Sequence, residues 1–334
     1  MPGIIETPSF KTINVKELHP TFAAEVTGVD FRDVSEEQFA EILTAMAKYG
    51  VCVFRNTGLT AEDDEAHVAF SRRFGELDNI RRYLGGGRQP RCSLYEIFDA
   101  GNLTEAGEVL DPDSPRAHSN RGNGLWHVDS SFNPRRASFS LLRACALPPA
   151  SHGCSTDFAD SRTAFAELPD DLQRELRAHE YVGAHSMAHS RKLGSPDFFR
   201  GMDVLANVPL YRHKIVQEHG PSGRMNLYVG THIHHLEEDG AEVPGSWELV
   251  QKLNAHATLP KYQTSVEWHE VGDMVIWDNR CVLHRAGGSA FEGRFKRDLR
   301  RTTVHDDSPT AWGLNDKESV WPGFNTFVQP KAAA

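Results

Sequence analysis

The order of the expected secondary-structure elements constrains the fold of this chain more than any other sequence feature. Two helical patterns lie near the start, at 35–49 and 60–74, where apolar residues repeat on one face. Short strand patterns separated by turns dominate the rest of the chain. They are expected at 51–54, 125–132, 137–144, 225–229, 264–269, 274–277 and 297–304. This order predicts an α+β, mainly β protein built around a β-barrel or sandwich.

The first helix has the clearest boundaries. Ser35 and Gln38 form a capping-box pattern at its start, and Gly50 is suited to end it. Two further helical patterns lie among the strands, one at 161–179 that a proline interrupts and one at 246–255. These helices are expected to flank the strands rather than to alternate regularly with them.

The stretch 84–124 differs in composition from its surroundings. It is rich in glycine, proline, asparagine and serine, and the only strand expected in it lies near 93–98. Long irregular segments inside compact domains often carry function. Because this one runs directly into a motif with histidine and aspartate, we expect it to be a lid over the active site.

Charge and composition argue against several kinds of partner. The net charge is −10 and the isoelectric point about 5.9, so we expect neither nucleic acid nor an anionic membrane as the main partner. No apolar run approaches the ~20 residues that cross a membrane, and no secretory pattern is expected at the start. The five cysteines are scattered without a CxxC pair, which favours a reducing cytoplasm over a disulfide framework. The sequence leaves a homo-oligomer open.

Common nucleotide-binding and hydrolase signatures are missing from the sequence. No GxGxxG follows an expected strand, and neither GxxxxGK[ST] nor GxSxG occurs. The chemistry must therefore come from another arrangement of side chains.

His127 and Asp129 are the first candidates for such chemistry. They lie two positions apart in the strand expected at 125–132, so both side chains would project from the same face. One more histidine from elsewhere would complete the two-histidine, one-carboxylate set that holds non-haem Fe(II) and leaves other positions of the metal open. The H-x-[D/E] pattern occurs twice more, at His235 and His305, so further sequence must select the functional copy.

The C-terminal third makes that selection. The segment 277–286 reads W-D-N-R-C-V-L-H-R-A, and 297–303 reads R-D-L-R-R-T-T. Together with L-W-H-V-D-S-S-F at 125–132, these segments resemble the TauD/TfdA family of Fe(II)/2-oxoglutarate-dependent dioxygenases. The resemblance covers most of the chain and is greatest to the 2,4-dichlorophenoxyacetate dioxygenases. It implies a single domain over 1–334 with a double-stranded β-helix (jelly-roll, cupin-like) core, flanking helices and a C-terminal extension at 305–334.

The resemblance also implies a role for individual residues. His127, Asp129 and His284 correspond to the iron ligands. Arg297 corresponds to the arginine that binds the distal carboxylate of 2-oxoglutarate, a task that suits a guanidinium group. Thr156 corresponds to a threonine that hydrogen-bonds the same carboxylate, although the residues before it read Gly-Cys-Ser rather than the family's Gly-Gly-Asp.

Arg301 and Asn123 are implied to lie at the active centre, beside the cosubstrate or an anionic substrate. Arg301 shares a strand face with Arg297, whereas the adjacent Arg300 is expected to point outward into a surface salt bridge. Asp278 and Asn279 could orient His284 through its second ring nitrogen, or form a turn.

Substrate contacts are less specific in the sequence. Tyr83 stands where the phenoxyacetate enzymes carry a substrate-contacting lysine, and Arg81 and His232 are further candidates. Arg81 could equally belong to a solvated face, and His232 to a cluster at a strand end.

The expected activity is oxidation, most simply hydroxylation, of a small anionic organic molecule. Fe(II) is the expected cofactor, and 2-oxoglutarate and O2 are the cosubstrates that become succinate and CO2. An aryloxyalkanoate is the first expected substrate. An amino-acid derivative, a sulfonate or a purine, with hydroxylation, desaturation or cyclisation, is the alternative. A non-catalytic cupin-like metal-binding module and a hydrolase that uses metal-bound water are the other classes considered.

Overall fold

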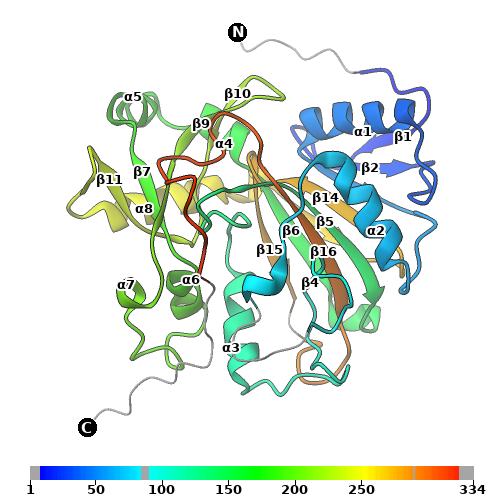
Figure 1. The fold of residues 1–334 in the computed structure, drawn as a ribbon. Coiled ribbons are helices and arrows are strands. Elements are labelled where there is room, and N and C mark those ends of the chain that lie inside the picture. The colour runs from blue at the N-terminus through cyan, green and yellow to red at the C-terminus, as the bar shows by residue number, and fades with distance from the viewer. Residues whose placement is uncertain (1–7, 84–89, 289, 323–334) are drawn as a thin grey trace.

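The fold is that of a computed structural model, which describes residues 8–83, 90–288 and 290–322. Within these ranges, no helix combines the length and the apolar character that a membrane crossing requires. Figure 1 shows β1, β2, α1 and α2 on one side of the molecule and α5, α8, β7 and β11 on the other.

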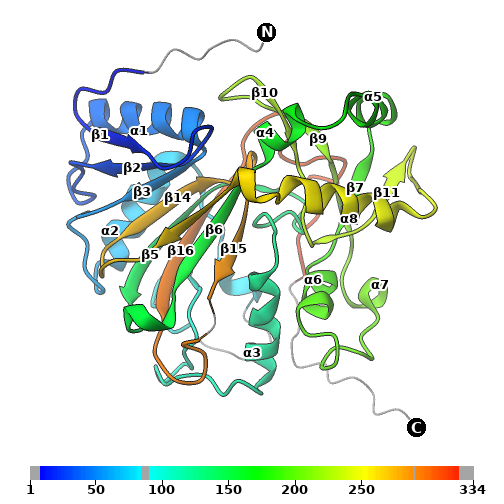
Figure 2. The ribbon, with the colours of Figure 1, turned by 180° about the vertical axis from the view of Figure 1, so that it is seen from behind.

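A seven-stranded sheet forms the larger side. Its strands lie in the order β1, β2, β3, β14, β5, β16 and β4. Their bounds are β1 Asn14–Glu17, β2 Ala24–Thr27, β3 Val51–Phe54, β14 Met274–Asp278, β5 Ala137–Ala146, β16 Asp298–His305 and β4 Phe98–Asp99. All neighbours pair antiparallel except β2 and β3. Strands from both ends of the sequence thus meet at the centre of one sheet (Figure 2).

Helices α1 (Glu36–Tyr49) and α2 (Asp64–Ser71) cover one face of this sheet. Helix α1 has the predicted capping box and ends at Gly50, whose φ of 71° suits a glycine. Its apolar face packs on buried side chains of β3, β14, β5 and β16. Helix α2 is shorter than predicted, because Asp63 accepts hydrogen bonds from the backbone and hydroxyl of Thr60 and forms a turn first.

A three-stranded sheet packs on the opposite face. It has the order β13 (Gln263–Glu267), β6 (Ser155–Asp160) and β15 (Val282–Gly287). One apolar cluster joins the two sheets, with Phe158 of β6 close to Trp277 of β14 at 5.5 Å between ring centroids. The result is a mixed α/β structure with several antiparallel sheets, which agrees with the α+β expectation.

The other side of the molecule carries a four-stranded sheet, a hairpin and several helices. The sheet order is β12 (Ala241–Glu242), β11 (Ile233–Glu238), β7 (Val182–His185) and β8 (Tyr211–Lys214), and the hairpin is β9 (Val216–His219) with β10 (Arg224–Leu227). The helices are α4 Ser161–Ala166, α5 Asp170–His179, α6 Met187–Gly194, α7 Val204–Asn207 and α8 Ser246–Ala257. A second apolar cluster holds α4, α5 and α8 against these strands.

The stretch predicted to be irregular contains little regular structure. Residues 84–89 lie outside the described ranges, and the strand expected near 93–98 is only the two-residue β4. Helix α3 (Pro115–Asn120) then leads to the 3-10 turn η4 (Arg121–Gly124). The other described 3-10 turns are η1 Arg72–Phe74, η2 Ile80–Tyr83, η5 Ala150–His152 and η6 Pro260–Tyr262.

The strand predicted at 125–132 is wrong. Only His127 makes a bridge in this stretch, to His284 of β15, and the chain then turns at Ser130, where φ is 56°. The backbone N–H of Asn133 donates to the Ser130 carbonyl and closes this turn. The alternation of apolar and polar residues here arises from packing against the core rather than from sheet pairing.

The C-terminal segment crosses from β16 to the other side of the molecule. Trp321 is buried there against Phe132 and Tyr211, with 5.4 Å between the ring centroids of Trp321 and Phe132. Phe132 lies three positions after Asp129, so this segment reaches the neighbourhood of the candidate metal ligands.

Candidate metal centre and active site

His127, Asp129 and His284 meet in space although they come from distant parts of the chain. One ligand atom from each lies within 4.8 Å of the others. His284 Nε2 is 3.6 Å from Asp129 Oδ2, and His127 Nε2 is 4.0 Å from Asp129 Oδ1. The backbone bridge between His127 and His284 holds the two histidines side by side. The predicted trio therefore forms one cluster, although it is assembled by a bridge and a turn rather than by a strand face.

The protonation of this cluster suits a divalent metal. His127 Nδ1 lies 2.7 Å from the Leu125 carbonyl, so it donates there and leaves the Nε2 lone pair facing the cluster. Burial, with His284 beside it, lowers the pKa of His127 to about 3. Burial alone would raise the pKa of Asp129, but Arg301 and His284 hold it well below its usual range. A neutral imidazole and an ionised carboxylate are the forms that bind metal.

Hydrogen bonds fix the position of the Asp129 carboxylate. Ser140 Oγ donates to its Oδ2 at 2.7 Å, and Asn279 Oδ1 accepts the Asp129 backbone N–H at 3.0 Å. Asn279 also donates to Ser140 Oγ. The sequence reasoning missed Ser140. Of its two alternatives for Asp278 and Asn279, the structure shows the turn, in which the Cys281 backbone N–H donates to the Asp278 carbonyl. Within the described residues, Nδ1 of His284 has no hydrogen-bond partner.

A cavity of about 90 Å³ opens in front of the three residues. Its lining includes all three, together with Asn123, Thr156, Arg297, Arg301 and His232. A larger cavity of about 530 Å³ adjoins it and shares Asn123 and Arg297. The structure thus brings most of the predicted site residues to one space.

The predicted substrate residues differ in their outcomes. Arg81 is exposed and lies over the ring of Tyr95, so the surface interpretation describes it better. The backbone of Tyr83 belongs to η2, but its side chain lies outside the described part of the structure. His232 does line the cavity, with its ring 5.4 Å from that of His127 and 4.9 Å from that of Phe132.

Arg297 and Thr156 lie together on the cavity wall that β6 and β16 border. Arg297 is buried and donates to the Ala100 carbonyl at 2.9 Å and to Cys154 Sγ at 3.2 Å. No carboxylate of the described residues forms an ion pair with it. Thr156 accepts a hydrogen bond from the Trp268 indole at 3.3 Å. A buried guanidinium beside a hydroxyl is suited to an external carboxylate.

The two adjacent arginines of β16 point in opposite directions. Arg301 Nη1 donates to Asp129 Oδ1 at 2.6 Å and lines the cavity. Arg300 pairs with Asp64 and Asp298 instead. The side chain of Arg300 is only 16% exposed, so its salt bridges are partly buried rather than on the surface.

Arg191 is a cavity residue that the sequence reasoning missed. It comes from α6, and its side chain reaches the same space as Arg301 and the His127 cluster. Nothing in the local sequence, R-K near a helix end, separates it from a surface arginine. Only the packing of α6 reveals its position.

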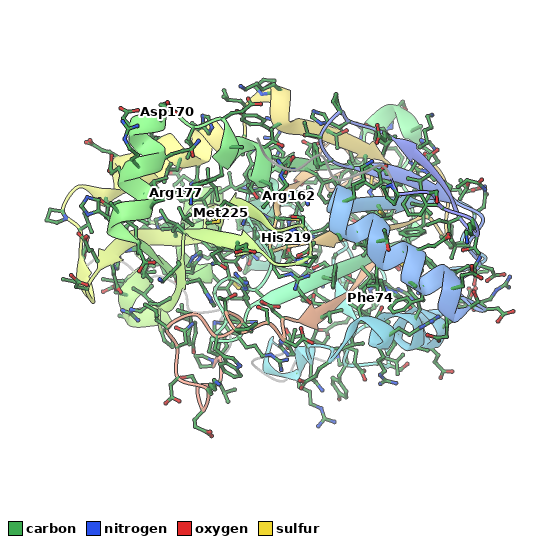
Figure 3. All side chains as sticks on the ribbon, turned by 90° about the horizontal axis from the view of Figure 1, so that it is seen from above. Phe74, Arg162, Asp170, Arg177, His219 and Met225 are labelled. Atoms are coloured by element: carbon green, nitrogen blue, oxygen red, sulfur yellow. The ribbon has the colours of Figure 1, made fainter. Side chains whose placement is uncertain are left out.

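A second cluster, His219, Asp278 and Cys281, also has metal-ligating groups close together. Figure 3 labels His219 and Arg162 near the middle of the molecule. Arg280 donates to both carboxylate oxygens of Asp278, and His219 Nε2 lies 3.0 Å from Asp278 Oδ2. The carboxylate is thus already saturated by cations, and the cluster is a buried ion-pair network rather than an open metal site.

This network predicts a pH dependence of stability. Burial alone would lower the pKa of His219, but Cys281 and Asp278 raise it from 6.5 to about 9. The stabilisation is therefore fully present below pH 6.5 and is lost as the pH rises through about 9. A shift of this size corresponds to about 3 kcal/mol. We expect the difference in free energy of unfolding between the parent chain and His219→Gln to shrink over this window in urea titrations. A constant difference would contradict the ion pair.

The fold and the site together define a class. Two histidines and one aspartate meet beside packed antiparallel sheets, at a cavity that a buried arginine also lines. Such a set of ligands is typical of non-haem Fe(II) oxygenases. A family model described as "Taurine catabolism dioxygenase TauD, TfdA family" matches residues 14–303. The chain belongs to this family. It is an Fe(II)- and 2-oxoglutarate-dependent dioxygenase by membership, and the early resemblance is confirmed.

Several relatives share most of the chain. An alpha-ketoglutarate-dependent 2,4-dichlorophenoxyacetate dioxygenase of Cupriavidus pinatubonensis is 36% identical, over 87% of this chain and 97% of its own. One of Burkholderia sp. is 34% identical, over 88% and 94%. The crystal structure of AAD-2 in complex with Mn(II) and N-oxalylglycine superposes with a TM-score of 0.77 at 32% identity, over 90% of this chain and all of the other. The fold is therefore that of this group of dioxygenases.

Proposed function

We propose that this chain oxidises a small anionic organic molecule, with His127, Asp129 and His284 holding the iron. The observation that carries the proposal is the shared cavity. It places the three candidate ligands, the buried Arg297 with Thr156, and the inward Arg301 around one space. A metal with three protein ligands on one side keeps the positions that two substrates need. Bound iron would supply the activation of O2 that couples decarboxylation of 2-oxoglutarate to oxidation of the substrate.

The side chains divide the work of binding. Arg297 and Thr156 bind the distal carboxylate of 2-oxoglutarate, because they offer a hydroxyl and a guanidinium that has no carboxylate partner among the described residues, both within a buried wall. Ser140 and Asn279 hold Asp129 in its ligating position. Arg301, which donates a hydrogen bond to Asp129, adds positive charge beside the cosubstrate or substrate. Burial of all these groups excludes water from the reacting atoms.

The proposal also assigns roles to the core, to the segment 84–124 and to the C-terminal extension. We assign the two packed sheets to a double-stranded β-helix core within a single domain, 1–334, with the ligands at one open end. Glu96, Phe98 and Asn123 line the cavity, which supports a covering role for the segment 90–124, the described part of the proposed lid 84–124. The described part of the extension 305–334 packs beside Phe132.

An aryloxyalkanoate is the first substrate to test. Relatives are named for 2,4-dichlorophenoxyacetate and for (S)-phenoxypropionate, and the arginines of this cavity suit a carboxylate. A sulfonate is the first alternative, since a 26% identical protein of Saccharomyces cerevisiae is named as a sulfonate dioxygenase. Amino-acid derivatives and purines, and desaturation or cyclisation in place of hydroxylation, complete the alternatives.

Anaerobic addition of Fe(II) and 2-oxoglutarate tests the proposed chemistry directly. We expect a visible iron-to-oxoacid charge-transfer band, because 2-oxoglutarate would chelate the iron through a C1 carboxylate oxygen and the C2 oxo oxygen. Absorbance is recorded before and after each addition. Screening carboxylates, sulfonates and purines for substrate-dependent succinate release under O2 then identifies the substrate class.

The outcomes separate the classes considered. Absence of the band from the folded chain would favour a non-catalytic metal-binding module. Turnover without O2 and without succinate would favour a hydrolase that uses metal-bound water.

A further inference from the structure

Arg191 is a buried cation of the cavity that forms no direct ion pair with a carboxylate of the described residues. Only 8% of the residue is exposed. Its Nη1 donates to Asn123 Oδ1 at 2.8 Å, and its Nε has no hydrogen-bond partner among the described residues. No ion pair to it occurs in the described part of the chain. A buried charge of this kind needs an opposite charge or a hydrogen-bonding ligand to offset the loss of its hydration.

The position of Arg191 depends on two glycines. A Cβ on Gly122 of η4 would lie 2.5 Å from Arg191 Nη1 and 3.2 Å from the Ser190 carbonyl. A Cβ on Gly194 would lie 2.6 Å from the Gly122 backbone nitrogen. Because neither residue has a side chain, α6 approaches η4 closely, and the Arg191 guanidinium reaches the amide oxygen of Asn123. The site is thus built by close packing rather than by a flexible surface side chain.

The other two arginines of the cavity have partners already. Arg301 donates to Asp129, and the proposed function assigns Arg297 to 2-oxoglutarate. Arg191 stays charged, since burial, with Arg301 nearby, lowers its pKa only to about 10. Its charge is therefore left for a further anion that enters the same space.

The surroundings of Arg191 show what that anion is attached to. Met187, one turn earlier on α6, also lines the cavity, as do Phe132 and Phe98. These apolar side chains share the cavity with the guanidinium and the candidate metal ligands. The cavity therefore combines a guanidinium that has no carboxylate partner with apolar side chains, which suits an organic acid with a hydrophobic body.

We propose that Arg191, held in place by Asn123, binds the acidic group of the primary substrate. The inference rests on the proposed function and extends it by naming the residue that selects for anions. It also gives Asn123 a definite part, as the amide that positions the guanidinium.

The test compares charged and neutral probes on the anaerobic complex with Fe(II) and 2-oxoglutarate. Phenoxyacetate and 1-hexanesulfonate are titrated beside phenoxyacetamide and 1-hexanol, and dissociation constants are taken from the change in the charge-transfer band. In the parent chain, we expect each anion to bind more tightly than its neutral counterpart. Arg191→Met should weaken the anions at least ~30-fold, because the buried charge pair is lost, and the neutral probes less than ~3-fold.

Three variants complete the design. Arg191→Lys should retain part of the preference for anions, because it keeps the charge without the planar fork. Gly122→Ala should weaken the anions too, because its methyl group displaces the guanidinium. Arg200→Met removes the same charge from a side chain that is 81% exposed and should change nothing.

Each other outcome overturns the inference. Equal binding of anions and neutral probes by the parent chain would show that the cavity does not select for charge. Equal weakening of both probes in Arg191→Met would assign Arg191 to the shape of the cavity. Loss of the band in Arg191→Met, with the parent band intact, would assign it to the cosubstrate. Absence of the band from the parent chain would instead contradict the proposed function itself.

Discussion

Replacing His127 with alanine is expected to abolish stoichiometric Fe(II) binding, and with it the charge-transfer band and succinate release. Two ligands on a first-row metal hold it far more weakly than three, and the removed imidazole is one whose Nε2 already faces the Asp129 carboxylate. The measurement is iron per chain after desalting, together with anaerobic absorbance and succinate release with an identified substrate. We expect activity to fall by more than the ~10–100-fold that the loss of an outer-shell partner of a metal ligand costs.

His219→Ala is the matched control for this change. It also removes a buried histidine from a cluster of metal-ligating groups, but that cluster is filled by the contacts of Arg280 with Asp278. We expect lower stability with unchanged iron content. Loss of iron in His219→Ala, with iron retained in His127→Ala, would place the metal in the other cluster and overturn the assignment.

The second large effect is expected for Arg297→Met on the affinity for 2-oxoglutarate. Removing one partner of a buried charge pair costs about 3–5 kcal/mol, which corresponds to a rise of ~100-fold or more in the KM for 2-oxoglutarate. The kcat at saturating cosubstrate should change far less, because Arg297 is remote from the reacting carbon in the proposed arrangement. Initial rates of succinate formation against 2-oxoglutarate concentration give both constants.

Arg300→Met is the control, three positions further along the chain on β16. Its guanidinium points away from the cavity to Asp64 and Asp298, so it should lower the free energy of unfolding and leave the KM for 2-oxoglutarate within ~2-fold. A similar rise of KM in both variants would refute the role of Arg297. Arg297→Lys should lie between Arg297→Met and the parent chain, because an ammonium group cannot reproduce the two-pronged contact.

Local signals in the sequence predicted the parts of the fold that depend on neighbouring residues. The capping box of Ser35 and the glycine at 50 gave the limits of α1 within one residue. The proline between α4 and α5, and the turn before β14, were recognisable for the same reason. His284 lies far from His127 in the sequence, so no local signal connects the two residues. The resemblance to a family predicted that they meet.

The rest could not be predicted, because it depends on tertiary packing. The stretch 125–132 has the alternation of a strand, yet the partner that it would need is replaced by a single bridge and a turn at Ser130. Arg191 reaches the cavity only because two glycines let a helix approach a 3-10 turn. Ser140 is an ordinary strand residue until its hydroxyl is seen beside Asp129. None of these contacts leaves a local pattern in the sequence.

The burial of Trp321 against Phe132 has a consequence for how specificity can diverge. The family model ends at residue 303, so a tail outside the shared pattern supports one wall of the reaction space. Sequence drift in that tail could reshape the wall while leaving the iron chemistry intact. Exchanging this tail between relatives is therefore a route to exchanging substrate preference without changing any of the candidate metal-binding residues.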